Sequence, residues 1–158
     1  MHIVLVEPEI PGNTGNISRL CAAIGAELHL VKPLGFSIDD KHLKRAGLDY
    51  WHLVKVHVHE SFVEMQKLYC GYSFYYCSTK APYSYSEKAY TMDDVFVFGK
   101  ETAGLPEHLL ETYHEDCIRI PMIEEARSLN LSNAVAIIAY EALRQNDFPE
   151  LCAAGSIV

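Results

Sequence analysis

Hydroxyl and amide side chains are concentrated between residues 128 and 133, immediately before an apolar helical pattern. Four of these six positions carry such a group: Ser128, Asn130, Ser132 and Asn133. One or two of them would cap a helix by accepting hydrogen bonds from its unpaired backbone N–H groups. The others exceed what capping requires, so we predict that this segment also contacts a small polar ligand.

The segment FGKETAGLP, Phe98–Pro106, has a glycine near each end and one carboxylate, Glu101, between them. Gly99 at the end of a strand would let a ligand approach the backbone closely, and Gly104 permits a turn with positive φ. The glycine spacing is that of a phosphate-binding P-loop, but Leu-Pro stands where Lys-Ser/Thr must be, which argues against an NTPase. The alternative is an ordinary strand–turn–helix joint, with Pro106 as the first helical residue.

Arg19 is a third candidate for contact with a ligand. It lies two positions after the apolar Ile17, so it points away from the apolar stripe and shares a helix face with Asn16. We place it in the first turn of a helix, where a cation opposes the macrodipole and an anion such as phosphate would offset the penalty. A solvated surface arginine is the alternative. The nearby Gly12 and Gly15 do not form GxGxxG, which argues against a dinucleotide site.

The histidines and cysteines do not predict a metal centre. His57 and His59 alternate with valines, so we expect both on the polar face of a strand, and no cysteine lies near them in the sequence. The five cysteines are scattered and contain no CxxC pair, which favours reduced thiols over a disulfide framework or a zinc site. We therefore expect no bound metal.

Composition is that of one globular domain. The chain has 158 residues, of which 49% are hydrophobic and 22% charged. No apolar run approaches the roughly 18 residues of a membrane span, and the start lacks a secretion signal, so we expect a cytoplasmic protein with no membrane partner. The net charge of −8 argues against binding nucleic acid. A basic cluster at residues 41–45, followed by Tyr50 and Trp51, would nevertheless suit RNA. A solvated helix face is the alternative there, and composition leaves the partner open.

Six short apolar or alternating runs predict strands, and helical patterns lie between several of them. The predicted strands are Ile3–Val6, Glu27–Val31, Val54–Val58, Ser73–Cys77, Val95–Phe98 and Ile118–Ile120. This order indicates an α/β fold, with a mostly parallel sheet covered by helices on both faces. Ligands of such sheets bind beyond the carboxyl ends of the strands. All three candidate segments follow predicted strands, so we expect them to meet at one edge of the sheet.

Three segments, in this order, resemble the three motifs of the SPOUT RNA methyltransferases. They are NTGNISR (Asn13–Arg19), FGKETAGLP (Phe98–Pro106) and RIPMIEEARSLNLSNAVAI (Arg119–Ile137). The resemblance covers almost the whole chain and is strongest to the small, single-domain bacterial enzymes that methylate the ribose 2′-OH of the tRNA wobble nucleotide, cytidine or modified uridine. Two positions depart from close relatives, Cys77-Ser78 in place of Leu-Thr and Leu129 in place of methionine. Both are compatible with contacts made through the backbone.

The resemblance implies one SPOUT domain over residues 1–158, a C-terminal trefoil knot and a homodimer with tRNA bound across both subunits. It also implies S-adenosylmethionine as the methyl donor, held largely by backbone groups of the knot loops. The cofactor-binding residues that it implies are Cys77, Ser78, Gly99, Glu101, Gly104, Ile120, Met122, Ser128 and Leu129. For contact with tRNA we expect Lys44, Arg45 and Tyr50.

The resemblance assigns the catalytic position to Arg19, with Asn16 and Asn133 in support. A sulfonium methyl group is already activated, so the protein must mainly position it and help the 2′-OH to lose its proton. Arginine stays protonated in proteins and is a poor base, so we expect Arg19 to orient the hydroxyl and an adjacent phosphate. The alternatives are methylation of another tRNA or rRNA position, or a nucleotide- or RNA-binding module without catalysis.

Overall fold

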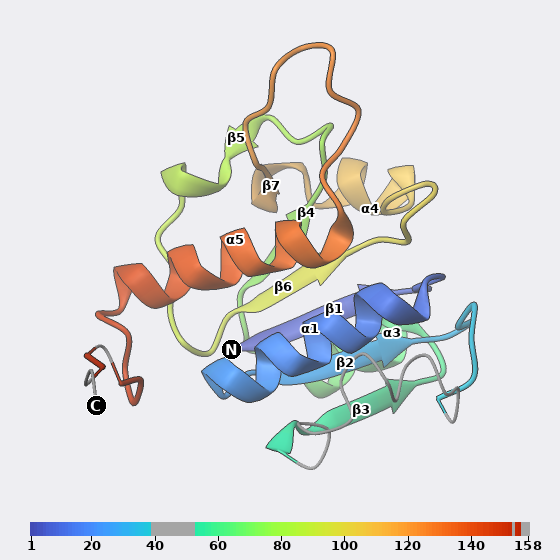
Figure 1. Cartoon of the computed structure of the whole chain (residues 1–158). Helices are drawn as coiled ribbons and strands as arrows, with labels where there is room; N and C mark the ends of the chain where they lie inside the picture. Colours follow the sequence, from blue (N-terminus) through green and yellow to red (C-terminus); the bar gives the residue numbers. More distant parts are fainter. Residues whose placement is uncertain (39–52, 153, 156–158) are drawn as a thin grey trace.

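The computed structural model describes residues 1–38, 53–152, 154 and 155. Within these ranges, seven parallel strands form one sheet in the order β3-β2-β1-β6-β4-β7-β5 (Figure 1). The strands are β1 (His2–Val6), β2 (Glu27–Val31), β3 (Val56–His59), β4 (Phe74–Cys77), β5 (Tyr83–Ser84), β6 (Val95–Phe98) and β7 (Cys117–Arg119). The helices are α1 (Pro11–Ile24), α3 (Phe62–Leu68), α4 (Glu107–Thr112) and α5 (Leu131–Gln145). The predicted α/β class and parallel sheet are confirmed.

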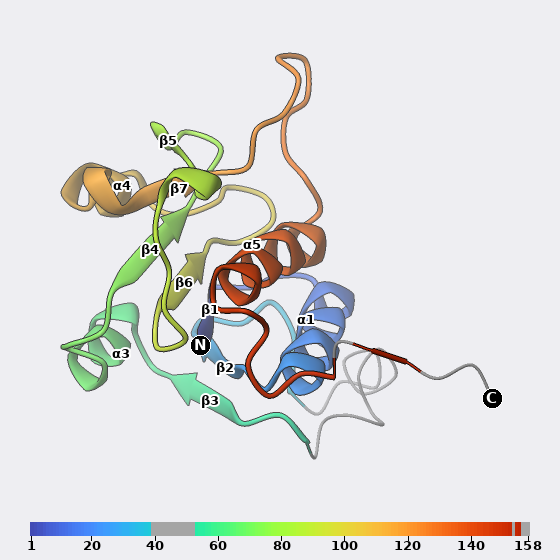
Figure 2. The same ribbon diagram turned by 90° about the vertical axis from the view of Figure 1, so that its left-hand side faces the viewer.

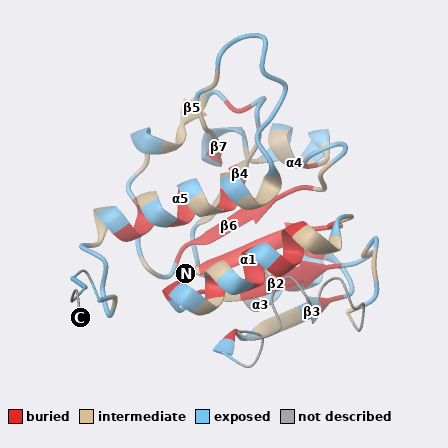
Figure 3. Ribbon diagram, in the orientation of Figure 1, coloured by how far each residue is buried: buried red, intermediate tan, exposed pale blue. Residues whose placement is uncertain are grey.

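Helices cover both faces of the sheet (Figures 1 and 2). Helices α1 and α5 lie side by side on one face, and α3 and α4 lie on the other. Strand β1 shows the consequence for its side chains: Ile3 and Leu5 join the core beneath α1 and α5, whereas Val4 and Val6 join the core beneath α3 and α4. Strands β1 and β6 are buried along their whole length (Figure 3), which explains why all their residues except His2 are apolar.

Helix α5 shows why its sequence forms a long helix. Its residues Val135, Ile138, Ala139, Ala142 and Leu143 recur at helical spacing and are all buried. Burying each of the larger side chains contributes about 1.5–3 kcal/mol, so packing of this stripe against α1 and the sheet stabilises the helix. No helix within the described ranges is both long and apolar enough to cross a membrane.

Helix α1 begins well before its predicted start, and this corrects the position of Arg19. The sequence prediction began the helix after Asn16, but the helix begins at Pro11, whose fixed φ suits a first helical position. Arg19 therefore lies in the middle of a 14-residue helix and not in its first turn. The predicted conflict between its charge and the helix macrodipole does not arise there, because that effect is confined to the terminal turns.

Other boundaries shift by one or two residues. Strand β3 runs from Val56 to His59 in place of Val54–Val58, and β7 ends at Arg119 in place of Ile120. Pro106 is the residue that precedes α4, so the first helical residue is Glu107. Strand β5 was not predicted, because its two residues are too few to show a periodic pattern.

Candidate functional site

A cavity of about 580 Å³ opens at the carboxyl ends of β4, β6 and β7. Its walls come from the segments after these strands and from the start of α5. Its volume lies within the range of roughly 300–1,000 Å³ that is typical of small-molecule sites. All nine residues that the sequence predicted for cofactor binding line it, namely Cys77, Ser78, Gly99, Glu101, Gly104, Ile120, Met122, Ser128 and Leu129. The fold therefore gathers residues from three separate segments around one space.

The two glycines of the Phe98–Pro106 segment have different roles. Gly104 has a φ of +71°, as predicted for a turn that favours glycine. Its backbone N–H donates to the carbonyl of Lys100 at 2.8 Å, which closes the turn. A Cβ atom on Gly99 would lie 2.0 Å from the carbonyl carbon of Gly104. The close approach that we predicted at Gly99 is thus made by the chain's own backbone, which leaves no room for a side chain.

Glu101 links this segment to the start of helix α1. Its carboxylate accepts hydrogen bonds from the backbone N–H groups of Glu9, at 2.8 Å, and Ile10, at 3.2 Å, and from Nδ2 of Asn13, at 3.1 Å. Ile10 is the N-cap residue and has no side-chain acceptor of its own. A carboxylate at this end of a helix is also favoured by the macrodipole. Glu101 therefore replaces the missing local cap and holds α1 against the cavity.

A second set of hydrogen bonds links α1 to α5. Nδ2 of Asn130 donates to Oδ1 of Asn13 at 3.0 Å. Oδ1 of Asn130 accepts from the backbone N–H of Ser132 at 2.9 Å and from its hydroxyl at 2.6 Å, so Asn130 caps α5. Some of the polar side chains between residues 128 and 133 therefore form hydrogen bonds within the protein. Asn13 was missed by the sequence analysis, although its position beyond the first strand in NTGN was the available signal.

The three predicted catalytic residues lie outside the cavity lining. Asn16 and Arg19 are exposed and sit about one turn apart on α1, and Asn133 is exposed at the start of the neighbouring α5. The structure places them on two helices that lie side by side, but not at the cavity wall of the same chain. The predicted tRNA contacts Lys44, Arg45 and Tyr50 fall within residues 39–52, outside the described residues.

Two charged groups beside the cavity, Lys100 and Glu9, have partners within the protein, and the thiol of Cys77 is neutral. Nζ of Lys100 lies 3.0 Å from Oε2 of Glu7, and this pairing raises the pKa of Lys100. The carboxylate of Glu9 accepts hydrogen bonds from the hydroxyl and the backbone N–H of Thr102, which lowers the pKa of Glu9. Burial raises the pKa of the Cys77 thiol well above its ordinary value. Cys77 is therefore a wall of the cavity and not a nucleophile at neutral pH.

One expectation about the histidines was wrong. His57 and His59 do share one face of β3, but that face is not open to solvent at His59, which is buried and contacts His29. The carboxylate that contacts His57 comes from the neighbouring strand, where Oε2 of Glu27 lies 2.9 Å from Nε2 of His57, whereas the adjacent Glu60 pairs with Lys32. Pairing between strands thus creates a cluster that spacing along the chain did not reveal.

Comparison with known proteins connects this geometry to a family. The sequence model described as "SpoU rRNA Methylase family" matches residues 1–140. The chain is 52% identical over 147 residues to the tRNA (cytidine(34)-2′-O)-methyltransferase of Methylovorus glucosotrophus, covering 92% of this chain and 96% of that protein.

Two solved structures share the fold. One, described as giving "structural insights into the 2-OH methylation of C/U34 on tRNA", has a TM-score of 0.89 and 43% identity, and the match covers 92% of this chain and 95% of that one. The other is a SpoU methyltransferase from Streptomyces viridochromogenes in complex with the cofactor AdoMet, with a TM-score of 0.81 and 25% identity over 93% of this chain and 58% of that one. The match to most of the chain agrees with the resemblance that the three motifs predicted, and the chain belongs to the SpoU rRNA methylase family.

Proposed function

We propose that the protein transfers a methyl group from S-adenosylmethionine to the ribose 2′-OH of the tRNA wobble nucleotide, a cytidine or a modified uridine. One observation carries the proposal: the three motif segments meet at one cavity. Hydrogen bonds through Asn13 connect them there. The relative from Methylovorus glucosotrophus, whose name states this activity, supports the choice of substrate because the match spans nearly all of both chains.

The cavity fits a ligand such as S-adenosylmethionine. Ile120, Met122 and Leu129 supply apolar surface for a flat ring, and the strand ends and the turn around Gly99 supply backbone hydrogen-bonding groups. The hydroxyl of Ser128 adds a polar contact on the opposite segment. When bound, this cofactor would supply an already activated methyl group. The remaining task for the protein is therefore to orient the ribose and exclude competing nucleophiles.

Within this proposal, Arg19 positions the ribose and an adjacent phosphate. Its guanidinium stays protonated and can donate hydrogen bonds to two oxygen atoms in a fixed plane. Asn16 on the same face and Asn133 on α5 present amides that can hold the sugar oxygens. Because Arg19 does not line the cavity of its own chain, we propose a homodimer in which the second subunit completes the reacting centre.

We also propose a trefoil knot near the C-terminus and a location in the cytoplasm, where tRNA is modified. The strand order supports the knot. β7 lies beyond β4, whereas α5 lies beside α1 and along β6, so the chain after β7 turns back across the sheet to reach it (Figure 1). The segment between β7 and α5 includes Met122 and Ser128, so the same return path would form one wall of the cavity.

The experiment is transfer of a labelled methyl group from S-adenosylmethionine to bulk tRNA, followed by mass spectrometry to locate the modified nucleotide. We expect label on the wobble ribose. Label at another tRNA or rRNA position would replace the proposed substrate. No transfer despite measurable cofactor binding would contradict an enzyme and favour a binding module.

Arg19→Ala tests the proposed role of the arginine. We expect it to abolish methyl transfer while cofactor affinity, measured by calorimetry, stays unchanged, because Arg19 lies outside the cavity lining. The matched control is Arg144→Ala, an exposed arginine on α5 that pairs with Glu141 and should retain activity. Loss of both transfer and cofactor binding in Arg19→Ala would mean that Arg19 is structural.

A further inference from the structure

A row of histidines crosses the first three strands on the sheet face covered by α3. In β1 and β2, His2 and His29 lie two residues before Val4 and Val31, which belong to the core on that face. The parallel register places His2 beside Glu27 and His29 beside His57. All four side chains therefore project from the same face, although they come from three different parts of the chain.

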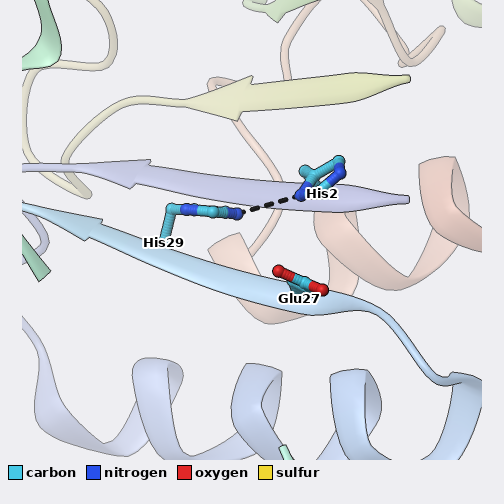
Figure 4. Close-up of side chains that lie close together, drawn as sticks. All are labelled: His2, Glu27 and His29. Atoms are coloured by element: carbon cyan, nitrogen blue, oxygen red, sulfur yellow. Dashed lines mark hydrogen bonds between the residues drawn. The ribbon is translucent and has the colours of Figure 1, made fainter. Parts of the chain in front are cut away.

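The nitrogen and oxygen atoms of this row are close together. Nδ1 of His2 lies 3.1 Å from Nε2 of His29, and one ligand atom from each of His2, Glu27 and His29 lies within 4.8 Å of the others (Figure 4). His29 is fully buried and His2 is 9% exposed, so both rings are largely removed from solvent. The methyl-transfer proposal uses none of these residues.

We propose that His2, Glu27 and His29 bind one divalent transition-metal ion, with Zn²⁺ as the best match. Two imidazole nitrogens and one carboxylate oxygen form the ligand set of open zinc sites, with bonds of roughly 2.0–2.2 Å. A tetrahedral ion at that distance separates two ligand nitrogens by about 3.3 Å, close to the observed 3.1 Å. The ion would replace the proton now shared by the two rings, and a small rotation of the Glu27 carboxylate would complete the set.

The surrounding contacts are those that orient metal ligands. The second ring nitrogen of His29, Nδ1, is 3.0 Å from Nε2 of His59, which fixes the ring and leaves Nε2 for the ion. Oε1 of Glu27 accepts from Nζ of Lys55 at 3.0 Å, and Oε2 lies 2.9 Å from Nε2 of His57. The two proposed ligands on β2, Glu27 and His29, are thus both held by side chains of β3 or of the residue just before it.

The site would be open on one side and separate from the methyl-transfer cavity. The Glu27 side chain is 26% exposed, which leaves access for a water molecule as the fourth ligand. His2 and Glu27 are the first residues of β1 and β2, at the amino ends of the strands, whereas the cavity lies at the carboxyl ends of the sheet. The ion would therefore stabilise the fold and take no part in the methyl-transfer step.

The test uses the full chain without an affinity tag, stripped with a chelator and titrated with Zn²⁺ by calorimetry. We expect one ion per chain and a visible spectrum of the four-coordinate type when Co²⁺ is used in its place. Zn²⁺ should also raise the midpoint of thermal unfolding, because an ion that binds only the folded state stabilises it.

Glu27→Gln and His2→Gln are the informative variants, and each should weaken Zn²⁺ binding at least tenfold. Glu27→Gln changes a partly exposed side chain, so it keeps the test decisive if His2→Gln does not fold. His114→Gln is the matched control, because His114 is exposed and also lies beside a glutamate, Glu115. Binding of less than one ion per chain, or equal affinity in Glu27→Gln and His114→Gln, would overturn the proposal and leave a hydrogen-bonded histidine chain.

Discussion

At Gly99 an added methyl group would clash with backbone atoms of the same segment. A Cβ atom there would lie 2.0 Å from the carbonyl carbon of Gly104 and 2.2 Å from the backbone nitrogen of Leu105. Both obstacles are backbone atoms, which cannot rotate away as a side chain can. Overpacking typically costs about 1–3 kcal/mol, and a backbone clash lies at the upper end or beyond.

We therefore expect Gly99→Ala to lower the free energy of unfolding by at least about 3 kcal/mol in urea titrations. The control is Gly12→Ala on α1, where nothing lies within 4 Å of the added atom. That variant should not destabilise the protein and should stabilise it by up to about 1 kcal/mol, because alanine is favoured over glycine in a helix. Equal destabilisation by the two variants would contradict the close approach of the two segments.

Glu101 is the second residue whose replacement should lower the free energy of unfolding. Glu101→Gln keeps one acceptor oxygen but turns an NH₂ group toward the donors of Glu9, Ile10 and Asn13. Leaving such donors unpaired costs about 1–3 kcal/mol, so we expect a loss of that size in unfolding experiments. Glu107→Gln is the control, because its pair with Lys80 is largely exposed and its loss should change stability far less. A Glu101→Gln variant as stable as Glu107→Gln would show that Glu101 does not cap α1.

At the residue scale, the cavity lining could be predicted and the start of α1 could not. Gly99, Glu101 and Gly104 stand out in the sequence by residue type, as does Ser128. The other five predicted residues that line the cavity were implied only by the family resemblance. The true start of α1 depends on Glu101, whose contact with Asn13 spans 88 residues. Without that distant acceptor, the turn-like residues from 12 to 16 resemble a loop.

At the scale of elements, helix α5 contains the group with the clearest response to acid. Hydrogen bonds from Arg144 and Gln145 lower the pKa of Glu141 to about 2. The ordinary value of about 4.3 applies in the unfolded chain, so the unfolded state binds the proton more readily. The stabilisation by Glu141 is therefore complete above about pH 5 and is lost as the pH falls toward 2.

We expect Glu141→Gln to lower the free energy of unfolding at pH 6. The loss should be less than about 1 kcal/mol, because Arg144, the partner of Glu141, is largely exposed. This difference should shrink when the same urea titrations are repeated near pH 2.5. A difference that does not change between the two pH values would show that ionisation of Glu141 does not stabilise α5.

Most strands could be predicted to within two residues, because strands buried on both faces consist mainly of apolar residues. The histidine row could not, since it depends on the register between strands. His2 lies beside Glu27, and His29 beside His57, only once the strands pair. Periodicity along one strand carries no information about which residue of the next strand lies opposite.

At the scale of the whole molecule, binding of S-adenosylmethionine should raise the stability of the folded protein. If S-adenosylmethionine binds only the folded chain, a concentration of 100 times Kd adds about 2.7 kcal/mol. For a protein of this size we expect the thermal midpoint to rise by about 5–10 °C. Methionine at the same concentration is the control and should cause no shift. No shift with S-adenosylmethionine at saturation would contradict the assignment of the cavity.

The proposed knot and homodimer lie beyond what local patterns can predict. Periodicity identifies strands and helices, but it does not say which segment passes through which loop or which exposed face meets a second chain. Asn16 and Arg19 illustrate the point, because their exposed positions on α1 are equally compatible with solvent and with a partner surface. Only the resemblance of whole motifs carried these two expectations.

The position of β6 also constrains the order of events during synthesis. β6 lies between β1 and β4 and is the strand that joins the two halves of the sheet. Until Phe98 has left the ribosome, the edge of β1 that pairs with β6 has no partner, although Ile3 and Leu5 are already available to aggregate. A nascent chain that stalls before this point would leave the edge of β1 exposed, and one released just beyond it could join β1, β6 and β4 into one sheet.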